Sequence, residues 1–252
     1  MYDSPMPNSL DIPLKRIAVE AAVIVASILL AFAIDAWWDE RQERIEETDI
    51  LLGLKSEFSR YRDDLERSIE YHANVRLLTE ELMAATRRGS WSSETLSVDY
   101  ALITLSDPMS HDYGGGVLDA LISAGRLEII SDSDLRIRLA SWSEVFDEVR
   151  DDEIRSRNFG QNQVIPYMLR WHISQSRGME LCCNSWSQWP LPTRSIEDDP
   201  GALSRLLSDP EFDMLLEFRY TNIAHIALEY ETAMQAMSDI LDAIDHSLFK
   251  LQ

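Results

Sequence analysis

The sequence predicts an all-α protein in which one N-terminal transmembrane helix continues into an antiparallel bundle of long helices. Three observations support this fold class. An apolar run of membrane-spanning length lies near the N-terminus, apolar residues recur at spacings of three and four along much of the remaining chain, and no region shows the alternation typical of a strand. Along the 252 residues we expect a tail (1–13), a transmembrane helix (14–38), a helical stalk and bundle (39–177), an irregular loop region with a short helix (178–209), and a long C-terminal helix packing on the bundle (210–252).

The predicted transmembrane helix contains an 18-residue apolar run, residues 17–34, with one charged residue, Glu20, and one other polar residue, Ser27. With residues 35–38 it would extend about 33 Å, which is enough for a hydrocarbon core of about 30 Å. A cleaved signal peptide and a buried core helix are the alternatives. The run is long for a signal peptide and no small-x-small cleavage site follows it, and a core helix is rarely apolar all round.

Interfacial anchors flank this run. Lys15 and Arg16 precede it, and Trp37 and Trp38 end it, where an aromatic belt would lie. Positive charges on the two sides nearly balance, so orientation rests on a weak bias from the acids. We expect a single-pass protein of the cell inner membrane with its soluble domain outside the cytoplasm.

Glu20 is the sharpest candidate site, because an ionisable group in a span is a functional hypothesis by default. It lies only three residues inside the run, and Arg16 lies four residues before it. A structural or interfacial role is therefore favoured, with contact to a neighbouring chain next and an ion or proton path last. Asp35, beside the two tryptophans, is expected at the interface.

Small residues in the run would let two spans approach closely. The expected partners are therefore the lipid bilayer and either a second copy of the chain or another membrane protein. The small residues are Ala22, Ala26, Ser27 and Ala31.

The span is expected to run directly into a long stalk helix, because residues 39–88 contain no proline and one glycine, Gly53. Gly89, just after the basic pair Arg87–Arg88, is the expected stop. The predicted buried stripe is Leu51, Leu54, Phe58, Tyr61 and Leu65.

Shorter helices are expected at residues 94–105 and 117–124, the second closed by Gly125. Polar residues 131–134 then start a long helix. Its pattern fades from about residue 150 and resumes at residues 164–169, with Pro166 as a kink or break. The predicted buried face of this helix is Leu135, Leu139, Trp142, Phe146 and Val149.

The last predicted helix, residues 210–249, has the most regular stripe in the chain, with the three–four spacing suited to a bundle or coiled coil. Its members are Phe212, Leu216, Arg219, Ile223, Ile226, Tyr230, Ala233, Met237, Leu241, Ile244 and Leu248.

Charge and cysteine content exclude several functions. Most of the net charge of −21 follows Trp38, where it amounts to −19. A soluble portion that acidic repels nucleic acid and anionic lipid headgroups, so no nucleic-acid partner is expected. The two cysteines, Cys182 and Cys183, are adjacent and rarely pair with each other, so no disulfide framework is implied and their role stays open.

No catalytic, metal or cofactor constellation is found. The glycine-rich stretch 110–116 could bind an anion at a helix N-terminus, but it lacks the Lys-Ser/Thr and preceding strand of a phosphate loop, so a connector is favoured. Acids in 147–153 are read as a solvated helix face. The histidines show no pairing at helical spacing; they are His72, His111, His172, His225 and His246.

Glu20, Asp35, Trp37 and the following Glu40–Arg41, taken with residues 118–142, resemble a family of bacterial single-span membrane proteins that carries no assigned function. The resemblance covers roughly residues 14–150 and implies a membrane helical architecture without chemistry.

The leading functional hypothesis is a membrane-anchored helical interaction or scaffold protein without catalytic activity that self-associates. The alternative is an extracytoplasmic helical sensor that binds a small ligand and signals through a partner chain. Trp186 and Trp189 are the aromatic candidates for such a ligand pocket.

Overall fold

The computed structural model describes residues 14–92, 97–106, 116–171 and 195–251, with side chains described from residue 19 onward. All regular elements in these ranges are helical, which confirms the prediction of an all-α protein. They are α1 (Leu14–Arg88), α2 (Val98–Thr104), α3 (Val117–Ser123), the 3₁₀ turn η1 (Leu127–Ile129), α4 (Ser133–Phe159), the π-helical turn η2 (Gly160–Val164), α5 (Ile165–Arg170), the 3₁₀ turn η4 (Ile196–Asp198), α7 (Pro200–Leu207) and α8 (Pro210–Leu251).

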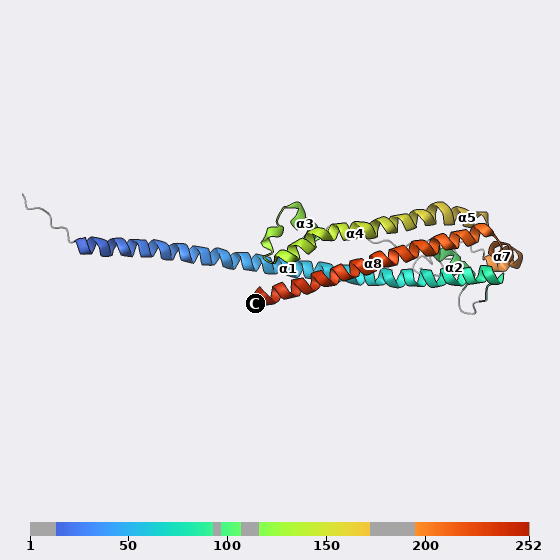
Figure 1. Cartoon of the computed structure of the whole chain (residues 1–252), viewed down its shortest axis with the longest axis horizontal. Helices are drawn as coiled ribbons and strands as arrows, with labels where there is room; N and C mark the ends of the chain where they lie inside the picture. The colour runs from blue at the N-terminus through green and yellow to red at the C-terminus, as the bar shows by residue number, and fades with distance from the viewer. Residues whose placement is uncertain (1–13, 93–96, 107–115, 172–194, 252) are drawn as a thin grey trace, which may run out of the picture.

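Helix α1 is a single element of 75 residues, about 110 Å long at a rise of about 1.5 Å per residue. Its first part projects beyond the other helices (Figure 1), and the side chains of residues 19–45 are all exposed. We call residues 19–45 the projecting segment. The helix ends where expected: Gly89 has φ +70°, and Ser90 N–H donates to the Ala85 carbonyl, as in a glycine-terminated helix.

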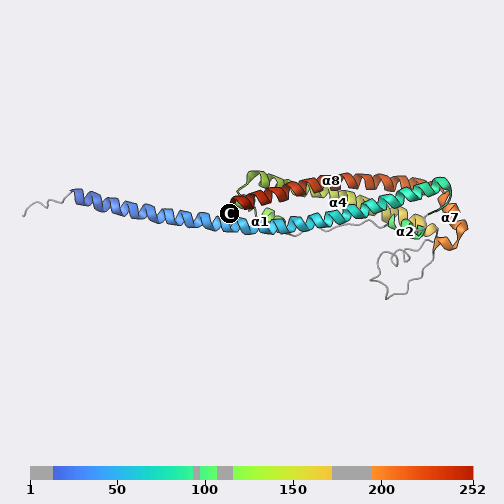
Figure 2. The ribbon, with the colours of Figure 1, turned by 90° about the horizontal axis from the view of Figure 1, so that it is seen from below.

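Helix α8 lies along both α1 and α4, and it runs in the opposite direction to α1 (Figures 1 and 2). The direction follows from two contacts. Lys55 Nζ lies 2.6 Å from Asp245 Oδ1, whereas Thr86, further along α1, donates to Asp213, which is earlier in α8. The three long helices therefore pack lengthwise, and the shorter elements lie around them.

The predicted stripes are the buried faces of these helices. On α1 all five stripe residues are buried, and on α4 and α8 all are buried except Phe146 and Leu248, which are partly buried. The spacing of apolar residues thus identified the contact faces correctly.

The buried apolar residues form two cores. The proximal core, nearer the projecting segment, combines residues 51–65 of α1 with α3, the first part of α4 and the C-terminal half of α8. The distal core combines residues 78–85 of α1 with α2, residues 164–168, α7 and the start of α8. Between them lies a layer of buried polar residues, here called the polar layer: Ser68, His72, Glu153, Ser156 and Arg219.

The apolar pattern fades after residue 150, but the helix does not end there. Helix α4 continues to Phe159 and is followed directly by η2 and α5. Its inward positions there are Glu153, Ser156 and Gly160, so the apolar pattern stops although burial does not. Pro166 lies in the first turn of α5, directly after η2, where the Ile165 N–H donates to the Gly160 carbonyl in the π-helical pattern, so the helical run changes its hydrogen-bond register beside the proline and does not end there.

Other boundaries differ by a few residues. The helix expected at 94–105 is α2, which begins after the Ser97 N-cap. Helix α3 ends at Ser123, followed by Gly125 at φ +65°, and α8 continues two residues past the expected end. The described part of region 178–209 contains η4 and α7. Predictions for His111, His172, the cysteine pair, Trp186 and Trp189 lie outside the described residues.

Candidate functional site

The projecting segment carries the predicted membrane span. Among the described residues, α1 is the helix long and apolar enough to cross a membrane, judged by length and composition. Its large apolar side chains are open to the surroundings: Leu29 is 62% and Phe32 is 66% exposed. A cleaved signal sequence passes the same test of length and composition.

The predicted contact residues all lie on this segment, and no other part of the described chain covers them. The Ser27 hydroxyl donates to the Val23 carbonyl at 2.8 Å, so its hydrogen bond is satisfied within the helix. The exposed candidates are Glu20, Ala22, Ala26, Ser27, Ala31 and Asp35.

These candidates divide between two faces of the helix. At about 100° per residue, Ser27 and Ala31 lie within about 20° of Glu20, whereas Ala22 and Ala26 lie about 160° and about 120° from it. The polar residues of the run therefore share one face with a small residue, and we call Glu20, Ser27 and Ala31 the polar face. The four small residues do not form one contact surface.

The interfacial anchors are described only in part. The exposed rings of Trp37 and Trp38 have centroids 6.3 Å apart at the end of the apolar run. Lys15 and Arg16 lie within α1, but their side chains are outside the described ones.

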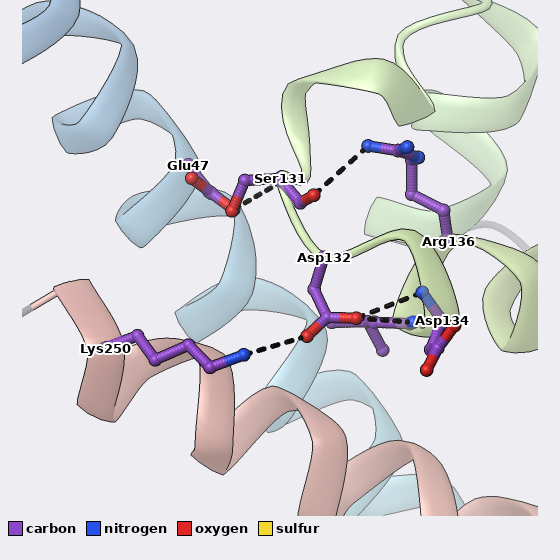
Figure 3. A network of polar contacts seen from close by, with 7 residues as sticks. Glu47, Ser131, Asp132, Asp134, Arg136 and Lys250 are labelled. Carbon is purple, nitrogen blue, oxygen red and sulfur yellow. Dashed lines mark hydrogen bonds and ion pairs between the residues drawn. The ribbon is translucent and has the colours of Figure 1, made fainter.

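At the junction where the other helices meet α1, a buried acid holds the segment that leads into α4 (Figure 3). Glu47 Oε1 accepts the Ser131 backbone N–H at 2.6 Å and the Ser131 hydroxyl at 2.7 Å. Arg136, one turn into α4, donates back to the Ile130 carbonyl at 2.5 Å. The entry to α4 is thus bonded to α1 on one side and to its own first turns on the other.

The neighbouring Asp132 joins this junction to α8 (Figure 3). Its carboxylate caps α4 by accepting the N–H groups of Asp134 and Leu135, at 3.0 and 3.1 Å, and lies 3.4 Å from Lys250 Nζ. The backbone hydrogen bond from Leu135, followed by the charge of Lys250, lowers the pKa of Asp132 below its ordinary value, against the opposing effect of partial desolvation. All three long helices therefore meet through polar contacts at this end.

A second buried acid of α1 lies at the helix N-terminus that follows the glycine-rich stretch, where the sequence favours a connector over an anion site. Glu57 Oε2 accepts the Val117 N–H at 2.6 Å and the Leu118 N–H at 3.2 Å, at the N-terminus of α3. A Cβ on Gly116 would lie 1.8 Å from Glu57 Oε1, so any larger residue at the preceding position would displace this carboxylate. Tyr61 also donates to Glu57 at 2.7 Å, and burial together with this bond raises the pKa of Tyr61 to about 12.

The polar layer places a fully buried cation between the two cores. Arg219 of α8 is 0% exposed, and its Nη1 donates to the Ser156 hydroxyl at 2.6 Å. Tyr230 donates to the buried Glu153 at 2.9 Å, and its ring packs edge-on against His72, with centroids 5.2 Å apart. In this register of α1, α4 and α8 the buried polar groups meet their partners. Sliding any of the three helices along its axis would separate these pairs, so the layer favours this register over neighbouring ones.

Sequence reasoning missed the buried acids because it treated acids as solvated. Glu47 carries a usable signal, since it lies four residues before Leu51 and so continues the buried stripe. Arg219, by contrast, belongs to the predicted stripe of α8 and is buried there. Glu57 has no such signal, since its role depends on Val117, sixty residues away.

No group of three or more His, Cys, Asp or Glu side chains in the described part of the chain could hold a metal ion. Comparisons of this chain with protein-family models, with curated proteins and with solved structures found no match.

Proposed function

We propose that this chain is a single-span protein of the cell inner membrane whose soluble helices form an antiparallel bundle, and that it acts as a membrane-anchored interaction or scaffold protein without catalytic activity. The observation that carries the proposal is the continuity of α1. One helix contains both the exposed apolar segment and the buried stripe of the proximal core, with no break between them. A helix of this kind fixes the distance and direction of the bundle relative to the bilayer.

The exposed apolar side chains support membrane insertion of the projecting segment. Removing one Val, Leu, Ile or Phe side chain from water is worth about 1.5–3 kcal/mol, and the run 17–34 consists mostly of such residues and alanine. No other described part of the chain buries the described residues of this run. Insertion into the hydrocarbon core of a bilayer would remove this apolar surface from water.

The polar face supports self-association of the span. Glu20 and Ser27 are the polar side chains of the run, and they project from the side that also carries the small Ala31. In lipid, polar side chains that meet across two helices gain hydrogen bonds, and small residues let the backbones approach. A second copy of the chain presents the same face, so the contact is complementary to itself.

Cysteine crosslinking in native membranes tests this proposal. In a background with both native cysteines changed to serine, we expect Ser27→Cys to give oxidised dimers, because the polar face would lie at the interface. Ala22→Cys, on the opposite side of the same helix, is the matched control and should stay mostly monomeric. Monomer from both variants would contradict self-association, and extraction of the protein by alkaline carbonate would contradict membrane anchoring.

The soluble domain is proposed to lie outside the cytoplasm, and reporters fused at the two ends of the chain test this. Activity of a periplasm-specific reporter at the C-terminal end is the expected result. Activity of a cytoplasm-specific reporter there would reverse the orientation.

A further inference from the structure

A groove opens where the last turn of α8 reaches α1, next to the projecting segment. Its volume is about 350 Å³. The α1 residues that line it follow one another at spacings of three, four and one, so they share one side of the helix. The lining residues are Trp37, Arg41, Arg44, Ile45, Thr48, Asp49 and Leu251.

The charges in this groove are ordered along the helix. Arg41 and Arg44 lie nearer the projecting segment, and Asp49 lies further from it. Arg44 makes an exposed 2.7 Å pair with Glu40, whereas no described carboxylate lies within ion-pairing distance of Arg41. The groove therefore offers a cationic end with an available guanidinium and an anionic end about two helical turns away.

The cationic end lies at headgroup depth if the projecting segment spans the bilayer. Arg41 and Arg44 follow Trp38 by three and six residues, about 4.5 and 9 Å along the axis. The headgroup layer on each side of a bilayer is about 5–8 Å thick. Long side chains on a helix lean towards its N-terminus, which here brings both guanidinium groups closer to the bilayer.

We propose that this groove binds the headgroup of a zwitterionic phospholipid that carries a phosphate and a primary ammonium. The guanidinium groups of Arg41 and Arg44 bind the phosphate, and the carboxylate of Asp49 binds the ammonium. The exposed ring of Trp37 contacts the part of the lipid that enters the bilayer. This inference rests on the proposed membrane span.

Charge favours a zwitterion over an anionic lipid. The chain after Trp38 carries −19, so a headgroup with net negative charge is repelled over the whole approach. A headgroup with no net charge avoids this repulsion and still supplies a phosphate. Its ammonium also matches Asp49, which a glycerol or free phosphate headgroup would leave without a partner.

Native mass spectrometry of the full-length chain in detergent micelles tests the inference. The protein is titrated in separate experiments with phosphatidylethanolamine, phosphatidylcholine and phosphatidylglycerol of identical acyl chains. We expect phosphatidylethanolamine to be retained at least roughly fivefold better than the other two, since the loss of even one ordinary hydrogen bond changes affinity by about that factor. Soluble phosphoethanolamine is added as a competitor, and weak competition is expected because it lacks the acyl chains.

Variants separate the two ends of the groove. Arg41→Gln should lower retention of phosphatidylethanolamine, and Asp49→Asn should remove the preference for it over phosphatidylglycerol. Arg76→Gln is the matched control, because Arg76 is exposed on α1 and paired with Glu80 at i+4, far from the groove. It should retain phosphatidylethanolamine like the unchanged protein.

Equal retention of all three lipids, or equal effects of Arg41→Gln and Arg76→Gln, would overturn the headgroup site. Full competition by phosphoethanolamine alone would also overturn it, because the ligand would then be a soluble compound. Carbonate extraction of each variant from native membranes distinguishes these failures from that of the proposed function. If the chain stays in the membrane but shows no headgroup preference, only the headgroup site is overturned. If the chain is extracted, both the headgroup site and the proposed membrane span are overturned.

Discussion

The two parts of α1 form one helix under different constraints. The projecting segment, residues 19–45, is exposed on every side, whereas residues 46–88 bury one face mainly against α8, with side-chain contact to α4 through Phe58 and Trp142. Both parts have the intact backbone hydrogen bonding of a single helix. The comparison shows that the continuity of a helix depends on local backbone hydrogen bonds. What stabilises each part depends on where its apolar residues lie: all round the axis in the apolar run, and along one face in residues 46–88.

A substitution in the polar layer should give the largest contrast between the two parts of α1, because it should destabilise the bundle and leave the projecting segment unaffected. Arg219→Ala removes a fully buried side chain and its bond to Ser156, leaving a cavity between the cores. We expect a loss of about 3 kcal/mol or more in the free energy of unfolding of the bundle, with no change in membrane retention. Hydrogen exchange of α4 amides in micelles measures the first, and carbonate extraction the second.

Arg155→Ala is the control for that substitution, because Arg155 is exposed on α4 and pairs only locally with Asp152. It should change stability by no more than about 0.5 kcal/mol. Similar losses from the two substitutions would mean that the polar layer does not hold the cores together.

The same chemical change in the two parts of α1 gives the next largest contrast. Leu54→Ala, in the proximal core, should lower the free energy of unfolding by about 2–5 kcal/mol, because it leaves a cavity at a fully buried position. Leu29→Ala, in the projecting segment, should leave α4 exchange unchanged, because Leu29 is exposed and no described part of the bundle covers it. Loss of protection from Leu29→Ala would show that the bundle depends on the span.

Glu57→Gln tests whether the buried acids attach the connecting segments. The amide loses the charge-assisted bonds to two N–H groups of α3, at an expected cost of about 1–3 kcal/mol. The exposed Glu66→Gln on the same helix is the control, with no measurable loss expected.

An alkaline titration of the Tyr61 absorbance reports on the same variant. Because the folded pKa of Tyr61 is raised above its ordinary value of 10.0, its contribution to stability is present below about pH 10 and is lost as pH rises towards 12. Glu57→Gln should lower that pKa only in part, since burial is its largest cause. An unchanged pKa would mean that Glu57 does not bond Tyr61.

The sequence predicted the helical faces well because their signal is local. A stripe such as Leu51–Leu54–Phe58 is visible within two turns, and Gly89 and Gly125 marked helix ends at positions where φ is positive. The end of α4 was missed because burial there is polar. Glu153 and Ser156 face inward, and a pattern that counts apolar residues does not register them.

The contacts between distant segments were not predictable in the same way. Asp99 accepts the Ile196 N–H at 3.1 Å, and Glu197 accepts the Val98 N–H at 2.9 Å, so α2 and η4 cap each other across almost a hundred residues. Each acid taken alone is an ordinary first-turn residue. Only the fold brings the two ends together, and a single sequence carries no record of such a pairing.

The smallest expected effect lies at the junction between the two parts of α1, at the Asp132 cap. Asp132→Ala should lower the free energy of unfolding by about 1 kcal/mol near neutral pH, the usual loss on removing an N-cap, whereas Asp132→Asn should keep most of it. The folded pKa of Asp132 is lowered, so its charged form is favoured by folding. The charge-dependent part of the stabilisation is therefore present above the unfolded pKa, near 3.8, and is lost as pH falls through the lower folded value. Denaturant unfolding of the unchanged protein and both variants, at pH 7 and at pH 2–3, measures this dependence. The stability difference between the unchanged protein and Asp132→Asn should shrink in acid, and a difference that grew instead would place the stabilising charge elsewhere.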